Sequence, residues 1–157
     1  MVQVFIIFLA ALASATPIVQ DRALASIHTL FKAKGKLYFG SITDPVDIAN
    51  SQDAATIIAD FGAVSPENSM KWDAVEPSRG NFNFKGADQF INFSTSHNLL
   101  IRGHNTLWHA QLPSWVSAIN DATTLTAVIE NHVTTEVGRY AGKIYAWVCP
   151  PLPQLLV

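Results

Sequence analysis

The sequence predicts an α/β fold in which helices connect the strands of a parallel sheet. Short apolar runs alternate with longer segments whose apolar residues recur every three to four positions. This alternation favours a parallel sheet with crossover helices, and fully apolar strands suit a sheet covered on both faces. The predicted strands are 37–42, 62–64, 99–103 and 143–147, and the predicted helices are 24–34, 53–61, 87–97 and 123–140. Polar side chains follow the second and third strands, so they should meet at one end of the sheet.

Length and composition allow one domain and disfavour a nucleic-acid partner. A chain of 157 residues fits a single domain, and 49% hydrophobic residues suffice for a core. The net charge is −2, and no stretch is polybasic. Phosphate binding needs clustered Lys and Arg, so we expect no nucleic-acid partner.

The first 15 residues have the pattern of a secretory signal peptide. The apolar run 4–12 is too short to span a bilayer, and residues 13–15 (ASA) have the small-x-small form that signal peptidase accepts. No other stretch is long enough for a membrane span. We therefore expect a secreted, extracellular chain that begins at Thr16. Because residues 1–3 contain no Lys or Arg, a buried N-terminal strand or helix is the alternative.

Two isolated features have simple explanations. Cys149 is the one cysteine, so it cannot form an internal disulfide, and we expect an incidental thiol rather than a reactive one. Residues 92–94 (NFS) fit the acceptor pattern for N-glycosylation, but they lie in a predicted helix.

A series of motifs gives the chain its family resemblance. They are KGKLYFG (34–40), PENSMKW (66–72), EPSRG (76–80), RGH (102–104), WH (108–109), QLPSW (111–115) and GKIYAW (142–147). In this order they resemble the endo-β-1,4-xylanases of glycoside hydrolase family 10, in the form typical of filamentous fungi. The resemblance covers residues 25–147. It implies that 16–147 form the N-terminal half of a (β/α)8 TIM barrel, truncated after about four strands, from an enzyme that cuts xylan and needs no cofactor.

The same resemblance implies a set of substrate-binding residues. Glu67, Asn68 and Lys71 match residues that hold xylose hydroxyls on the non-reducing side of the cleavage point, and His104 and Trp108 match residues that contact the sugar there. Carboxylate, amide and ammonium groups supply complementary acceptors and donors for hydroxyls. An indole face covers the apolar face of a pyranose ring. The stretch 104–108 (HNTLW) departs from the family pattern between the His and the Trp, but its length is unchanged.

Each of these residues also has a structural interpretation. Glu67 and Lys71, four apart, could form a helical ion pair. His104 and His109 could suggest a metal site, but they lack acidic or Cys companions, and we expect no metal. The other candidates are expected to be structural: His132 as a satisfied core residue, Trp115 and Trp147 as packing residues, and 76–80 as a turn with an internal ion pair.

We expect no catalytic residue in this chain. Retaining glycosidases need two carboxyl groups about 5–5.5 Å apart. In the family the acid/base glutamate follows shortly after the match to Trp147, where this chain has VCPPL (148–152), and no glutamate follows Tyr140. The nucleophile belongs to a later strand. We therefore expect 148–157 to be an unrelated Pro-rich tail, since such a segment cannot continue a central strand. The predicted function is a secreted endo-1,4-β-xylanase by family, inactive as this chain; a non-catalytic β-glycan-binding fragment or a mis-spliced, non-functional product is the alternative.

Overall fold

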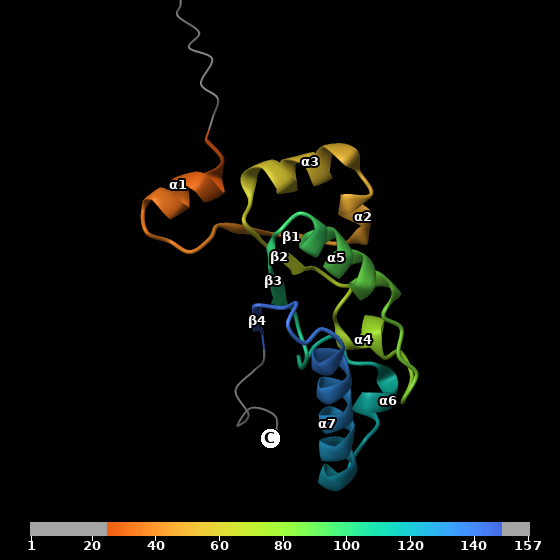
Figure 1. Ribbon diagram of the computed structural model, residues 1–157. Coiled ribbons are helices and arrows are strands. Elements are labelled where there is room, and N and C mark those ends of the chain that lie inside the picture. Colours follow the sequence, from red (N-terminus) through yellow and green to blue (C-terminus); the bar gives the residue numbers. More distant parts are fainter. Residues whose placement is uncertain (1–24, 149–157) are drawn as a thin grey trace, which may run out of the picture.

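The computed structural model describes residues 25–148, and its sheet has four parallel strands (Figure 1). The strands are β1 (Gly40–Thr43), β2 (Ala63–Pro66), β3 (Leu100–Gly103) and β4 (Ala146–Trp147), in the spatial order β1-β2-β3-β4. All three neighbouring pairs are parallel. The predicted parallel sheet is confirmed. The strands are shorter than predicted, and β4 has only two residues.

The four predicted helices are present. They are α1 (Ile27–Ala33), α3 (Ser51–Asp60), α5 (Lys85–Ser96) and α7 (Ala122–Arg139). Side-chain caps set several of their starts: Asn50 Oδ1 accepts from Gln52 N at 3.0 Å, and Asp121 Oδ1 accepts from Thr124 N at 2.7 Å.

Three further helices were not predicted from the sequence. They are α2 (Pro45–Ile48), α4 (Trp72–Val75) and α6 (Ser114–Ser117), each of four residues. A segment of this length is too short to display a helical period. Each follows the carboxyl end of a strand, so together they shape the end of the sheet that carries the polar motifs (Figure 1).

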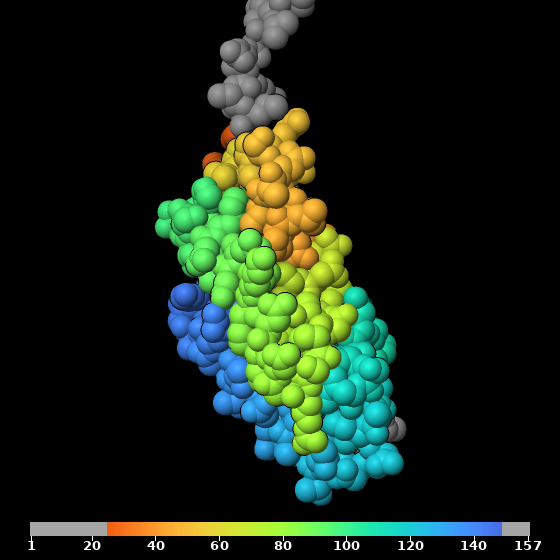
Figure 2. All heavy atoms as spheres, turned by 90° about the vertical axis from the view of Figure 1, so that its right-hand side faces the viewer, coloured from red at the N-terminus to blue at the C-terminus, as the bar shows by residue number. Residues whose placement is uncertain are grey.

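The main core lies between one face of the sheet and the helices. Val64 and Ile101 of the strands belong to the same buried cluster as Ile57 of α3 and Phe90 of α5. A second cluster joins the segments on the carboxyl side of the strands; its buried members are Trp72, Leu107, Val116 and Val128. Figure 2 shows the helical side of the molecule, with α5 lying between the α2–α3 segment and α7. Trp147 packs against the first cluster and Trp115 against the second, as predicted.

The opposite face of the sheet is not covered by residues 25–148. Ile42 of β1 is 61% exposed, and Tyr145 beside β4 is 56% exposed. The prediction of a sheet covered on both faces is therefore wrong for this part of the chain, because the connecting helices pack on one side only (Figure 1).

The turn 76–80 does not contain the predicted ion pair. Glu76 is buried, and its carboxylate is bonded to other groups: Oε2 accepts from His132 Nδ1 at 2.9 Å and from Trp72 Nε1 at 3.2 Å, while Oε1 accepts from Gly80 N at 2.8 Å. An acid that is buried needs such donors, and an exposed arginine in the same turn is not available inside the core. The contact between Glu76 and His132 instead joins the turn to α7.

His132 is a core residue, as predicted, but it is only partly satisfied. Its ring stacks on Trp72 with centroids 4.2 Å apart and planes 14° apart. Its Nε2 atom has no hydrogen-bond partner among the described residues, and Glu136 Oε2 lies 3.6 Å from that atom. The helical spacing that identified His132 gave no sign that Glu136 is buried beside it.

The remaining sequence features are placed as follows. The glycosylation pattern lies in α5, where Ser94 is buried and its Oγ donates to the Phe90 carbonyl at 2.7 Å. The signal-peptide prediction for 1–15, Cys149 and the tail beyond Val148 lie outside the described residues.

Candidate functional site

Three of the five predicted site residues lie in one loop after β2. Glu67 and Asn68 are exposed, and Lys71 ends the loop as the residue before α4. Lys71 Nζ donates to Asn68 Oδ1 at 2.8 Å and to Gln111 Oε1 at 2.7 Å. The alternative of a helical Glu67–Lys71 ion pair is wrong, since the loop is not helical and the ammonium bonds to two amides instead.

The other two predicted residues follow β3. His104 is half-buried and Trp108 is 39% exposed, with ring centroids 6.5 Å apart. The peptide bond between His104 and Asn105 is cis. The three residues between them, Asn105, Thr106 and Leu107, are all buried. The stretch that departs from the family pattern thus turns into the protein, while His104 and Trp108 remain at its surface.

Lys71 joins the two loops. Its Nζ atom lies 5.3 Å from the Trp108 ring centroid, within the range of a cation–π contact. An ammonium group has three N–H donors, and the amides of Asn68 and Gln111 take two of them. One donor is left for a ligand lying on the indole face. Glu67 has no contact of this kind among residues 25–148, so its place in the site depends on its position next to Asn68.

Gln111 is a site residue that the sequence analysis missed. It lies in the 111–115 motif, which contributes to the family resemblance. Its backbone is in the left-handed region, with φ 54°, a conformation uncommon for a side-chain-bearing residue. The separation of forty positions between Lys71 and Gln111 is not visible in any local pattern.

The electrostatics of the site favour a neutral histidine. Burial lowers the pKa of His104, and the nearby Lys71 ammonium lowers it further. At neutral pH the imidazole therefore carries one donor and one acceptor, as a sugar hydroxyl requires.

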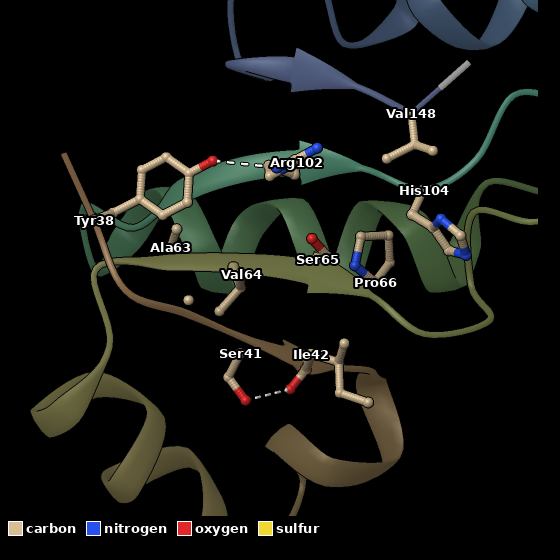
Figure 3. Close-up of a pocket in the computed structure, with 11 residues that line it drawn as sticks. Tyr38, Ser41, Ile42, Ala63, Val64, Ser65, Pro66, Arg102, His104 and Val148 are labelled. Carbon is tan, nitrogen blue, oxygen red and sulfur yellow. Dashed lines mark hydrogen bonds between the residues drawn. The ribbon is translucent and has the colours of Figure 1, made fainter. Parts of the chain in front are cut away.

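A hollow of about 450 Å³ lies over the open face of the sheet (Figure 3). Of the predicted site residues, His104 lines it, together with side chains that include Tyr38, Ile42, Ser65 and Arg102. Arg102 Nη1 donates to the Tyr38 hydroxyl at 3.4 Å. The hollow therefore continues from the loop residues onto the strands.

Residues 25–148 offer neither a metal-binding cluster nor a membrane-spanning helix. No group of three or more His, Cys, Asp or Glu side chains could hold a metal ion there. No helix in the same range is long and apolar enough to cross a membrane.

Comparisons with curated proteins point to xylanases. Endo-1,4-beta-xylanase 3 of Hypocrea jecorina is 52% identical over 126 residues, which cover 80% of this chain and 36% of that protein. Endo-1,4-beta-xylanase 2 of Claviceps purpurea is 50% identical over 122 residues, which cover 78% of this chain and 38% of that protein. The chain thus spans a little over a third of the length of these relatives.

Solved structures give the same result. Xylanase 10B from Thermotoga petrophila, in complex with xylobiose, matches with a TM-score of 0.71 and 29% identity over 78% of this chain and 38% of that one. A Penicillium canescens endo-1,4-beta-xylanase matches with a TM-score of 0.73 and 27% identity, with the same coverage. The family model described as Glycosyl hydrolase family 10 matches residues 26–149. This match covers more than half of the chain, and the four parallel strands fit the first half of a barrel, as predicted, so the chain belongs to glycosyl hydrolase family 10.

Proposed function

We propose that this chain supplies the xylose-binding part of an endo-1,4-β-xylanase cleft and that it does not hydrolyse xylan by itself. The observation that carries the proposal is the contact of Lys71 with both loops, through Asn68, Gln111 and Trp108. These groups combine hydrogen-bond donors and acceptors with an exposed indole, which is what a pyranose ring with its hydroxyls requires. The similar Thermotoga petrophila xylanase binds xylobiose, which supports a β-linked xylose oligomer as the ligand.

The proposed lack of hydrolysis rests on the missing carboxyl pair. The whole-enzyme reaction expected for the family is a double displacement, in which one carboxylic acid protonates the leaving oxygen and a carboxylate attacks the anomeric carbon. No glutamate of this sequence follows Glu136. Glu67 lies in the loop after β2 and was matched to hydroxyl binding, so we assign it no catalytic role.

Binding and hydrolysis can be tested separately on the full chain. We expect xylobiose to shift the NMR signal of the Trp108 indole N–H, with affinity no tighter than about millimolar because the ligand is enclosed on one side only. Lys71→Ala should weaken the affinity for xylobiose, as read from this signal, about tenfold or more, because it removes an ammonium donor and the contact between the loops. Lys85→Ala, which removes an exposed lysine at the start of α5, should leave it unchanged.

The outcomes distinguish the candidate functions. A xylobiose response without release of reducing sugar from xylan supports a glycan-binding fragment. Hydrolysis at rates ordinary for xylanases would overturn the proposed inactivity. A folded chain with no xylobiose response would overturn the binding role and favour the mis-spliced, non-functional product.

We further propose that residues 1–15 direct secretion. The support is the apolar run followed by the ASA sequence at 13–15. Expression in a filamentous fungus should place the chain in the culture medium with Thr16 at its N-terminus, as read by N-terminal sequencing. A chain that stays in the cells and retains Met1 would contradict this proposal.

A further inference from the structure

We propose that Asp44 is a positioning residue for the sugar-binding loop 67–71. The residue is 6% exposed and lies at the carboxyl end of β1, outside the set of residues that the resemblance assigns to substrate. The part of the inference that concerns sugar rests on the function proposed above, whereas the part that concerns the loop does not.

Both carboxylate oxygens of Asp44 accept hydrogen bonds from the loop. Oδ2 accepts from Asn68 N at 2.7 Å, and Oδ1 accepts from Ser69 N at 3.2 Å. Thr43 of β1 pairs in register with Pro66 of β2, so the residue after Thr43 lies beside the start of the loop. A buried carboxyl group that accepts from two backbone N–H groups fixes the loop at two points, since loss of the acceptor would leave both donors without a partner.

Hydrogen bonds to α2 fix the backbone of Asp44. Its backbone N–H donates to Asp47 Oδ2 at 2.8 Å, and its carbonyl accepts from Asp47 N at 3.0 Å and from Ile48 N at 3.1 Å. Pro45 follows, with its φ angle restricted by the ring. The short helix α2, which the sequence did not predict, thus acts as a rigid support for this carboxylate.

The contacts continue from Asp44 to the site. Asp44 binds the backbone N–H of Asn68, and Asn68 in turn accepts two hydrogen bonds from Lys71. The Asn68 backbone carbonyl accepts from Lys71 N at 2.9 Å, and its side-chain Oδ1 accepts from Lys71 Nζ at 2.8 Å. Lys71 then contacts Gln111 and Trp108. Asp44 therefore acts on the sugar site through Asn68 and Lys71 and does not need to touch the sugar.

Asp44→Asn is the direct test. The substitution keeps one acceptor oxygen but replaces the other with an NH2 donor, which would face an amide donor of the loop. We expect hydrogen exchange of the Asn68 and Ser69 amides to accelerate about tenfold or more and the Trp108 response to xylobiose to weaken by a similar factor. The control is Asp53→Asn, which removes the same charge from an exposed site in the first turn of α3. Exchange of the α7 amides reports whether either variant has lost its fold.

A second measurement uses the unaltered chain, so that the inference can still be tested if Asp44→Asn does not fold. A through-hydrogen-bond coupling should join the Asn68 amide nitrogen to the side-chain carboxylate carbon of Asp44. Its absence from a spectrum that resolves the backbone couplings of α7 would overturn the inference, as would unchanged Asn68 and Ser69 exchange in folded Asp44→Asn. If the coupling and the exchange effect are present but xylobiose gives no response in the unaltered chain, the role of Asp44 in the loop stands and the proposed sugar function fails.

Discussion

At the scale of single residues, the least expected feature is the buried group formed by Glu76, His132 and Glu136. The Glu76 carboxylate accepts hydrogen bonds from three N–H groups, those of Trp72, Gly80 and His132. Burial raises the pKa of Glu136 to about 8. Burial also lowers the pKa of His132, an effect that the hydrogen bond to Glu76 partly offsets. Both pKa shifts agree with a protonated Glu136 facing a neutral His132, whose Nε2 atom has no hydrogen-bond partner in residues 25–148.

Glu136→Gln should change how stability depends on pH. The pKa of Glu136 rises from an ordinary 4.5 to about 8 on folding. Between these values the unfolded chain releases a proton that the folded chain keeps, so the free energy of unfolding should fall as the pH rises across this window. The glutamine side chain of Glu136→Gln does not titrate, so the free energy of unfolding of the variant should fall less steeply over this pH range. Urea unfolding followed by tryptophan fluorescence at several pH values between 4.5 and 8 measures the slope.

The matched control is Glu130→Gln, an exposed position on the same helix. It should keep the slope of the unaltered chain. His132 contributes with the opposite sign: its pKa is lowered, so its contribution is lost as the pH falls through the lowered value. An identical slope in Glu136→Gln and in the unaltered chain would mean that Glu136 is ionised in the folded state.

At the scale of elements, α5 has the largest part in the core beneath the sheet. Phe90 and Ile91 are fully buried in the cluster that includes Val64 and Ile101 of the central strands. The helix also contacts α7, because Asp88 forms a two-pronged ion pair with Arg139 at 3.0 and 2.6 Å. Since much of that pair is exposed, we expect the apolar contacts to contribute more to stability.

Phe90→Ala should therefore be among the most damaging single changes. Removal of a fully buried phenylalanine side chain costs roughly 3–5 kcal/mol, a large share of the stability of a small domain. The neighbouring exposed position gives the control, since Gln89→Ala should change the free energy of unfolding by less than about 0.5 kcal/mol. Denaturant titrations of the two variants compare them directly; a loss below about 1 kcal/mol for Phe90→Ala would contradict the core described here.

The elements also show what sequence reasoning could reach. Helical periods longer than two turns and short apolar strands are local patterns, so the main helices and strands were predicted, with errors at their ends. The helices of one turn, α2, α4 and α6, have no period and were missed. Family motifs identified Lys71 and Trp108, but their meeting through Gln111 and the support from Asp44 depend on contacts between distant segments. No local pattern contains such contacts, and the partner of Glu76 was misjudged for the same reason.

At the scale of the whole molecule, one face of the sheet is left uncovered by residues 25–148. Ile42, Leu37 and Tyr145 are each more than half exposed, and they lie on or beside the two outer strands. Exposed apolar side chains next to unpaired strand edges favour association with other chains.

We therefore expect the isolated chain to self-associate. Sedimentation velocity at increasing concentration should show a rising average mass. Ile42→Lys, which places a charge on the β1 edge, should reduce this association, whereas Val46→Lys on α2, also highly exposed, should reduce it less. A single monomeric species at all concentrations, with a sharp cooperative melt, would contradict this expectation.

The strand order has one more consequence, for how the chain acquires its structure. Each strand lies next to the one made just before it, so the sheet can grow by adding one strand–helix unit at a time as the polypeptide leaves the ribosome. Each docking step then closes one connection, with paired residues 23 positions apart for Gly40 and Ala63 and 44 apart for Arg102 and Ala146. Nascent chains from which α5 has emerged should already hold β1 and β2 in place, with loop 67–71 formed before the segment that carries Trp108 is added.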